Sequence, residues 1–388
     1  MIKRTIIAPA LFALAIFTWL AGAAAAQDSA DFGTKLRVEL LRRLGHMPSI
    51  SACIIKGERV VWEDAWGWSD IYASREASGE TLYLIGSVSK VFTATAILQL
   101  HEAGHFELDD DVNAFLPFNL RNPAYPDTPI TFRMLLSHGA SLAQENNHFF
   151  STFYFRPYDA EELADSLSPD GSSYHSAYWM DYKPADRMEY ANIGYELLAH
   201  LVERISGQSF EDYVAERIFA PLGMDHTVYS VSGVEPDQLA MPYLQLLGVY
   251  LPMGHYEVGS LGAGGIRSTP NDLARFAIAL MNGGAYGDIR ILSKETVEIM
   301  QTAHWSEPSA QGFSYGLGWI LWPDKGMSGH AGGAFGGRSM LRVASSSDTA
   351  IIYAFNRLNP AFPPGLTPLL SYAERRLESI LWDIAAGY

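Results

Sequence analysis

Residues 87–105 read SVSKVFTATAILQLHEAGH, and this stretch decides how the rest of the chain must be arranged. From Ser87 to Ala103, apolar side chains fall on every side of the expected helix, and a helix of that kind is buried all round. Gly104 suits the left-handed position that commonly ends a helix. We therefore predict a central helix over residues 87–103 that the other elements of the fold enclose.

The start of this helix carries a pattern typical of hydrolytic sites. Ser87 and Lys90 are three residues apart, so a helix places both side chains on one face, one turn apart. A serine hydroxyl becomes an effective nucleophile when a neighbouring base takes its proton, and a buried lysine can lose its own proton near neutral pH. The structural alternative is that Ser87 only caps the helix and Lys90 extends to solvent.

The end of the helix carries a competing pattern. His101-Glu102-x-x-His105 matches the H-E-x-x-H motif of zinc proteases. That motif needs both histidines on one helical face and a third protein ligand. Gly104 is expected to end the helix before His105, and the chain has Asp111 where the extended motif has its third histidine. We therefore predict no metal site and no cofactor.

Composition and charge indicate an acidic globular protein. The 388 residues are 48% hydrophobic and 18% charged, and the formal net charge is −16. A surface of this sign repels phosphate backbones, so no nucleic-acid partner is expected. Cys53 is the single cysteine, which excludes an internal disulfide, and its alternating apolar surroundings predict an inert thiol buried in a strand.

The N-terminal segment has the features of a signal peptide. Lys3 and Arg4 precede an apolar run over residues 6–26, which ends in small residues before Gln27. A membrane anchor is the alternative, because the run is long enough to span a bilayer. We predict a signal peptide over residues 1–26, no stable membrane span after its cleavage, and a periplasmic or secreted mature protein.

The order of the expected elements indicates an α+β fold. A helix near residues 31–46 and a hairpin of two strands open the mature chain, and two strands and a helix over about 368–385 close it. We predict an antiparallel sheet flanked by helices and built from both chain ends, about 27–95 and 259–388. A mostly helical lobe, about 96–258, is inserted between them.

Two further segments carry groups suited to a catalytic site. In YAN, Tyr190 and Asn192 are two residues apart in an expected extended segment and so point the same way, unless Asn192 only caps the following helix. Residues 329–339 read GHAGGAFGGRS, and this glycine density lets a backbone lie close to a substrate. The segment lies just before an expected strand, and the structural alternative is an ordinary flexible loop.

In their order and spacing, SVSK, YAN and GHAGG resemble the motifs of the serine β-lactamase and penicillin-binding-protein superfamily. The similarity is to its class C-like branch, which also holds D-alanyl-D-alanine carboxypeptidases, D-aminopeptidases and family VIII carboxylesterases. Other similar stretches are LLSHGASL (135–142), PLGMDHT (221–227), GAGGIRSTPNDLARFAIALMNGG (262–284) and YGLGWI (315–320). The resemblance implies a β-lactamase/transpeptidase-like fold for residues 27–388.

The resemblance also implies roles for the residues of the first two motifs. Ser87 is expected to be the acylated nucleophile. Lys90 and Tyr190 are expected to share the work of general base and proton shuttle, and which of them takes the first proton stays open. Asn192 is expected to bind an amide or carbonyl group of the substrate.

The third motif is K-T-G in many members and H-x-G in some, and here it is formed by His330 and Gly332. The resemblance implies an oxyanion hole from the backbone N–H groups of Ser87 and Gly333. A histidine is mostly neutral at pH 7, so His330 offers weaker recognition of a substrate carboxylate than lysine does. Arg338 either supplies the missing charge or is a solvated surface residue.

These inferences predict an exported serine hydrolase that cleaves an amide or peptide bond through an acyl-serine intermediate. The alternatives are a carboxylesterase with weak β-lactamase activity and, in another class, a non-catalytic penicillin-binding or sensor protein. The expected substrate is a small peptide or ester. Aromatic tracts at 148–158 and 174–182 either belong to the core or wall a pocket for a bulky apolar group. The oligomeric state is left open.

Overall fold

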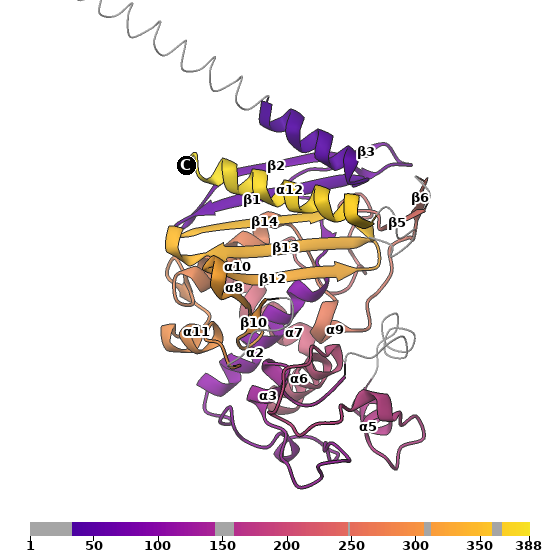
Figure 1. Ribbon diagram of the computed structural model, residues 1–388, viewed down its shortest axis with the longest axis vertical. Helices are drawn as coiled ribbons and strands as arrows, with labels where there is room; N and C mark the ends of the chain where they lie inside the picture. The colour runs from indigo at the N-terminus through magenta and orange to yellow at the C-terminus, as the bar shows by residue number, and fades with distance from the viewer. Residues whose placement is uncertain (1–32, 144–158, 247–248, 306–311, 359–366) are drawn as a thin grey trace, which may run out of the picture.

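The computed structural model describes residues 33–143, 159–246, 249–305, 312–358 and 367–388. The predicted signal peptide and the aromatic tract at 148–158 lie outside these residues. In the described part, a large sheet lies between two layers of helices (Figure 1). The predicted α+β class and the antiparallel sheet with flanking helices are confirmed.

The middle layer is an eight-stranded sheet whose neighbouring strands are all antiparallel, in the order β10-β11-β12-β13-β14-β1-β2-β3. Its strands are β1 (Ser49–Lys56), β2 (Arg59–Asp70), β3 (Arg75–Glu76), β10 (Ser314–Tyr315), β11 (Ile320–Trp322), β12 (Met327–Ala334), β13 (Gly337–Ala344) and β14 (Thr349–Phe355). Because β1 pairs with β14, the two ends of the chain meet in the middle of the sheet, as predicted.

The central strands are apolar on both faces because helices cover both. In β1, Cys53 and Ile55 face a large core that also contains residues of α2 (Ser89–Glu102) and α10 (Pro270–Met281). Ile54 faces the opposite core, with residues of α12 (Thr367–Ala385) and of the helix over 33–44. Continuous apolar strands of this kind are typical of a sheet buried on both sides.

The central helix predicted from the sequence is α2, and every residue from Ser89 to Leu98 is buried. It begins two residues later than predicted, because a 3₁₀ turn over Gly86–Val88 (η1) precedes it. It ends where predicted: Gly104 has φ +78°, its N–H donates to the His101 carbonyl, and the His105 N–H donates to the Leu100 carbonyl. This is the Schellman pattern of a helix end.

The middle of the chain supplies most of the remaining helices. They are α3 (Phe132–Leu136), α5 (Ala160–Leu167), α6 (Asn192–Ser206), α7 (Phe210–Val214), α8 (Ala220–Leu222) and α9 (Leu261–Gly264), followed by α10 and α11 (Lys294–Met300). Further 3₁₀ turns lie over Val112–Ala114, Ser176–Tyr178, Pro323–Lys325 and Ser345–Ser347. A π-helical turn over Ala215–Phe219 joins α7 to α8.

A small sheet in this middle region was not predicted. The hairpin of β5 (Tyr243–Leu246) and β6 (Val249–Pro252) pairs in parallel with β15 (Arg357–Leu358), far away in the chain. Strands this short have little periodicity of their own and depend on a distant partner. Two other short pairs are β4 (Tyr83–Leu84) with β7 (Arg267–Ser268) and β8 (Ala285–Tyr286) with β9 (Ile289–Arg290).

The division of the chain into two lobes stays a prediction. The expected boundary near residue 95 falls inside α2, and the β5–β6 hairpin lies within the stretch assigned to the helical lobe.

The glycine-rich segment at 329–339 is largely strand itself, so both its placement before a strand and the alternative of a flexible loop are wrong. Residues up to Ala334 belong to β12, and β13 resumes at Gly337 after a two-residue turn. The prediction was wrong because strand propensity counts glycine as a breaker, whereas pairing with β11 and β13 on either side holds the segment extended.

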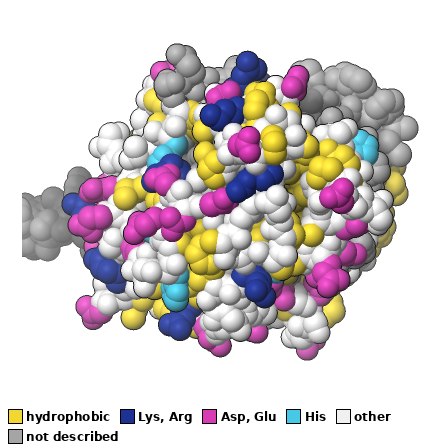
Figure 2. Space-filling view, turned by 90° about the horizontal axis from the view of Figure 1, so that it is seen from below, with side chains coloured by type: hydrophobic (Ala, Val, Ile, Leu, Met, Phe, Trp, Pro, Cys, Tyr) yellow, Lys and Arg dark blue, Asp and Glu magenta, His cyan; other side chains and the backbone are white. Residues whose placement is uncertain are grey.

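On the face of the molecule seen from below, acidic and basic side chains are interspersed (Figure 2). No continuous basic tract is visible among the described residues of that face. None of the helices in the described ranges is both long enough and apolar enough to cross a membrane.

Candidate active site

Ser87 lies in the η1 turn, directly before the N-terminus of α2. The chain reaches this turn through Gly86, which has φ +52°. A Cβ atom at Gly86 would lie 2.7 Å from the Gly333 carbonyl oxygen, so glycine is needed both for the backbone angle and for the close approach of β12. The turn therefore brings the partly buried Ser87 next to the third motif.

Lys90 is fully buried on the first turn of α2, and three acceptors surround its Nζ atom. Nζ lies 2.7 Å from Oδ1 of Asn192, 2.8 Å from the Ala263 carbonyl oxygen and 3.2 Å from Oγ of Ser87. Lys90 thus does not extend to solvent. The structure brings together Ser87 and Lys90, which are close in sequence, and Asn192, which is not.

Burial lowers the pKa of Lys90 to about 7, and the negative charge of Glu196 works against this shift. Near pH 7 much of the lysine is therefore a neutral amine, with two N–H donors and one lone pair. The Asn192 and Ala263 oxygens can take both donors, which leaves the lone pair for the Ser87 hydroxyl. This geometry suits Lys90 to accept the proton of Ser87.

Tyr190 hydrogen-bonds Ser87, and its ring centroid lies 5.0 Å from Nζ of Lys90. Burial raises the pKa of Tyr190, so its hydroxyl keeps its proton at neutral pH. A phenol in this state is a proton donor rather than a base.

His138 holds Tyr190 in place from both sides, a role that the sequence did not reveal. The Glu189 N–H donates to the His138 carbonyl, and the Ala191 N–H donates to its Nδ1 atom. The His138 ring lies 4.4 Å from the Tyr190 ring, centroid to centroid. Burial, with the charge on Lys90, holds the pKa of His138 well below its usual range, so the imidazole is neutral.

Asn192 is the first residue of α6, and it is Ala191 that occupies the capping position. The alternative in which Asn192 merely caps the helix is therefore wrong. Its Oδ1 atom instead accepts the hydrogen bond from Lys90. Because an amide has donors as well as an acceptor, the same side chain can also donate hydrogen bonds.

His330, in β12, is buried and has both ring nitrogens engaged. Its Nδ1 atom lies 2.8 Å from the Ala331 carbonyl oxygen and so must carry the proton, whereas Nε2 lies 2.6 Å from the Tyr315 hydroxyl, which donates to it. Burial and the charge on Lys90 lower the pKa of His330 to about 3. His330 is therefore neutral, and neither nitrogen is left for a substrate carboxylate.

Gly332 and Gly333 bring β12 against the Ser87 turn. A Cβ atom at Gly332 would lie 1.8 Å from the Ile85 carbonyl oxygen, and one at Gly333 would meet nothing closer than Nη1 of Arg338, at 3.7 Å. Oγ of Ser339, on β13, donates to the same Ile85 carbonyl and ties the turn to the sheet. The placement agrees with the implied oxyanion hole, whose role stays a prediction.

Arg338 lies beside Gly333 and is paired with a carboxylate. Its Nε atom lies 2.6 Å from Oε1 of Glu374, on α12, and the pair is partly buried. The guanidinium is therefore held by a carboxylate of a covering helix, so plain solvation does not describe it, and its role as a substrate charge stays a prediction.

Sequence reasoning missed three further residues of the site: Glu196, His138 and Tyr315. Glu196 is a charge in an otherwise apolar part of α6, between Ile193 and Leu197, and that anomaly was the one available signal. His138 and Tyr315 lie in stretches that carry the family resemblance, but their contacts depend on segments far apart in the chain.

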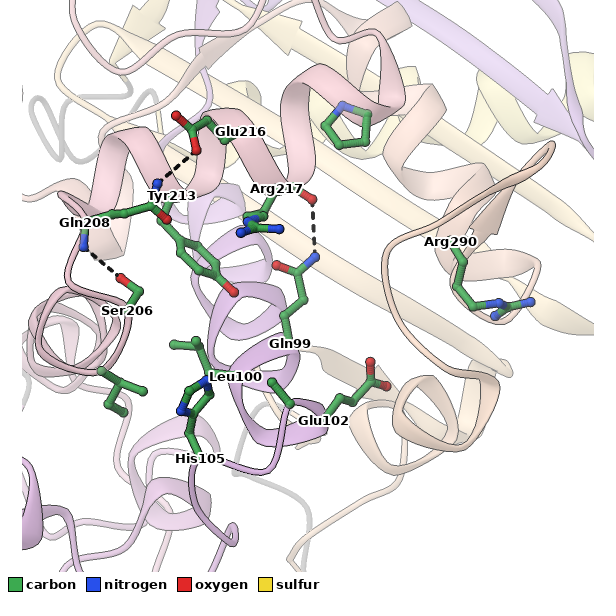
Figure 3. Close-up of a pocket in the computed structure, with 13 residues that line it drawn as sticks. Gln99, Leu100, Glu102, His105, Ser206, Gln208, Tyr213, Glu216, Arg217 and Arg290 are labelled. Atoms are coloured by element: carbon green, nitrogen blue, oxygen red, sulfur yellow. Dashed lines mark hydrogen bonds between the residues drawn. The ribbon is translucent and has the colours of Figure 1, made fainter.

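The H-E-x-x-H pattern lies at the opposite end of α2 from Ser87. His105 follows the helix end, while Nδ1 of His101 bonds the Phe106 carbonyl and Glu102 accepts from the Ser293 N–H. A surface pocket of about 550 Å³ opens there (Figure 3). Within the described ranges, no three His, Cys, Asp or Glu residues are grouped so as to hold a metal ion.

The fold, with Ser87, Lys90 and Tyr190 gathered at the start of a buried helix, defines the class of a serine hydrolase. The chain matches the Beta-lactamase family over residues 38–371 and belongs to that family. This membership makes it an enzyme of the serine hydrolase class, in place of the non-catalytic binding protein considered above.

Two curated relatives are similar over most of the chain. Penicillin-binding protein 4* of Bacillus subtilis (strain 168) is 27% identical over 346 residues, covering 82% of this chain and 70% of that protein. A putative D-alanyl-D-alanine carboxypeptidase of Escherichia coli (strain K12) is 26% identical over 314 residues, covering 70% of this chain and 68% of that protein.

Among solved structures, a D-amino acid amidase from Ochrobactrum anthropi SV3, complexed with L-phenylalanine amide, is similar in fold. Its TM-score is 0.71 at 22% identity, and the match covers 90% of this chain and 99% of the amidase.

Proposed function

We propose that this protein is an exported amidase or peptidase that acts through an acylated Ser87. The observation that carries the proposal is the setting of Lys90, whose two fixed acceptors leave its lone pair for the Ser87 hydroxyl. Its pKa of about 7 allows this lysine to act as a base at neutral pH.

In the proposed reaction, Lys90 takes the proton of Ser87 while Oγ bonds the substrate carbonyl carbon. The oxyanion formed is stabilised by the backbone N–H groups of Ser87 and Gly333. The C–N bond then breaks, and the leaving nitrogen receives the proton held by Lys90, relayed by the Tyr190 hydroxyl. Water next attacks the acyl-enzyme and releases the acid, and the proton of the water restores Ser87. Tyr190 suits the donor role because its raised pKa keeps it protonated.

For the substrate, we propose a carbonyl compound without a free carboxylate beside the scissile bond, such as an amino acid amide. His330 is neutral and has both nitrogens engaged, and Arg338 is paired with Glu374. His330 therefore offers no charge to a carboxylate, and the charge of Arg338 is offset by that of Glu374. The similarity in fold to a D-amino acid amidase agrees with this preference. A carboxylic ester also lacks that carboxylate and is the second candidate.

One labelling experiment tests the proposed chemistry. The protein purified after secretion is treated with a fluorophosphonate, with and without EDTA, and the labelled residue and the mature N-terminus are read by mass spectrometry. We expect label on Ser87, no effect of EDTA, and a chain that begins at Gln27. Label on a different serine, or loss of activity caused by EDTA alone, would contradict the proposal.

A substrate panel then tests the preference. We expect amides and esters of D- or L-amino acids to be hydrolysed faster than matched dipeptides with a free C-terminal carboxylate and faster than a chromogenic cephalosporin. A preference for the free carboxylate would overturn the substrate class without affecting the assignment of Ser87.

A further inference from the structure

We infer that Glu196 is a positioning residue of this site: it holds the backbone acceptor of Lys90 and supplies the buried negative charge that accompanies the ammonium form. The inference rests on the proposed function, because it concerns the base that activates Ser87. It assigns a task to a residue outside the three motifs.

Glu196 is buried, with 4% of its surface exposed, and it accepts hydrogen bonds from one short segment of chain. Oε1 accepts from Oγ of Ser260 at 2.6 Å and from the Ala263 N–H at 2.8 Å, and Oε2 accepts from the Gly262 N–H at 3.2 Å. Three donors directed at one carboxyl group stabilise its ionised form. Glu196 thus fixes residues 260–263 against α6.

The same segment supplies an acceptor to Lys90. The Ala263 carbonyl takes a hydrogen bond from Nζ of Lys90, while the Ala263 N–H is held by Glu196. Oγ1 of Thr93 donates to the Gly262 carbonyl and joins the segment to α2 as well. Glycine at position 262 permits this contact, since a Cβ atom there would lie 2.3 Å from the Tyr195 carbonyl oxygen.

Glu196 is also the anion that acts on Lys90. Asn192, the other fixed acceptor of Lys90, lies one helical turn before Glu196 on α6. The same helix therefore carries both side chains that act on Lys90. The other groups facing Lys90 are neutral near pH 7. They are Ser87 of the η1 turn, Tyr190 of the extended segment, Tyr195 of α6, His138 after α3 and His330 of β12. The carboxylate of Glu196 raises the pKa of Lys90 against the effect of burial.

The test compares wild type with Glu196→Gln, which removes the charge and keeps the shape. The rate of Ser87 labelling by a fluorophosphonate is measured from about pH 5 to about pH 9, a range that brackets the pKa of Lys90. The acid limb is the part of this profile in which the labelling rate falls as the pH falls. We expect the acid limb of the variant to move to lower pH by roughly one unit, because the ammonium form of Lys90 has lost its partner charge. Labelling below the midpoint should therefore be faster relative to the plateau than in wild type.

The matched control is Glu203→Gln, two turns along the same helix, where the carboxylate accepts from the Phe210 N–H and pairs with His200. We expect its acid limb to coincide with that of wild type. Glu196→Asp keeps the charge and should return the limb toward its wild-type position. If Glu196→Gln does not fold, Glu196→Ala removes the charge and the acceptors together at the edge of a pocket of about 50 Å³, and its acid limb is compared with that of Glu196→Asp.

The outcomes separate this inference from the proposed function. Labelling of Ser87 with the same acid limb in wild type and Glu196→Gln would overturn the role of Glu196 and leave the nucleophile in place. Absence of label on Ser87 in wild type would overturn the proposed function and, with it, this inference. A limb that moves equally in the Glu203→Gln control would show a general effect of charge on α6 and would also overturn it.

Discussion

At the scale of single residues, the site depends on how burial changes two basic groups. Lys90 and His330 are both enclosed, and burial disfavours the charged form of each. The pKa of Lys90 falls to about 7, within the working range of a base, whereas that of His330 falls to about 3. The two residues therefore differ in use: Lys90 can exchange a proton at neutral pH, and His330 remains a fixed, neutral hydrogen-bonding group.

This difference predicts the pH dependence of activity. The active form of Lys90 is the neutral amine, so kcat/KM should rise with pH through about 7 and fall roughly tenfold per pH unit well below it. The measurement is kcat/KM for amide or ester hydrolysis between about pH 4 and about pH 9, a range that includes the pKa of Lys90. His105→Ala, at the far end of α2, serves as the control and should keep the same limb. A profile without an acid limb in this span would contradict the assignment of the titrating base to Lys90.

At the scale of elements, the contact between β12 and the η1 turn sets the position of Ser87 relative to the strand. The contact is made by backbone on both sides: Gly332 lies against the Ile85 carbonyl, and Gly86 lies against Gly333. No side chain fits between these segments, so glycine is required by space. Close packing of a strand against a helix start thus explains the glycines at positions 332 and 86.

Two neighbouring substitutions test this packing. Gly332→Ala places a methyl group 1.8 Å from the Ile85 carbonyl oxygen, which must push β12 away from Ser87. We expect a loss of about 100-fold or more in kcat/KM, comparable to the loss of an oxyanion donor. Gly333→Ala keeps the backbone N–H and meets Arg338 only at 3.7 Å, so it should lose far less. Equal losses in the two variants, measured on folded protein, would contradict this explanation.

At the scale of the whole molecule, the sheet separates two cores with different tasks. The core on the side of α2 and α10 surrounds the helix that carries Lys90. The core on the other side joins the helix over 33–44 to α12, and both helices cover that face of the sheet (Figure 1). Arg37 and Asp383 form an ion pair between them at 3.6 Å. The second core lies on the face of the sheet opposite to α2, so we expect it to contribute stability without setting the chemistry.

Leu377→Ala tests this separation, because Leu377 is fully buried in α12. Removing most of a buried leucine side chain should lower the free energy of unfolding by about 2–5 kcal/mol, measured by urea denaturation. Below the unfolding transition, kcat/KM and its acid limb should match wild type. A shift of the limb would show that the second core does reach the active site.

Much of the fold was predictable because local patterns and tertiary packing agree. The apolar residues around α2 predict its burial, Gly104 predicts its end, and the strands on both sides of Ser345–Ser347 follow from their composition. The β5–β6 hairpin and the strand character of 329–334 were not predictable, because both depend on pairing with distant segments.

The sequence by itself determined which residues gather at the site: Ser87 and Lys90 by helical spacing, and Tyr190, Asn192 and the glycines of β12 by family resemblance. Only the tertiary structure decided what state these groups are in. The proton affinity of Lys90 depends on its burial, on oxygens of Asn192 and Ala263, and on the charge of Glu196. A pKa is a property of the surroundings, and these are assembled from segments more than 100 positions away, as the contact between Lys90 and Asn192 shows.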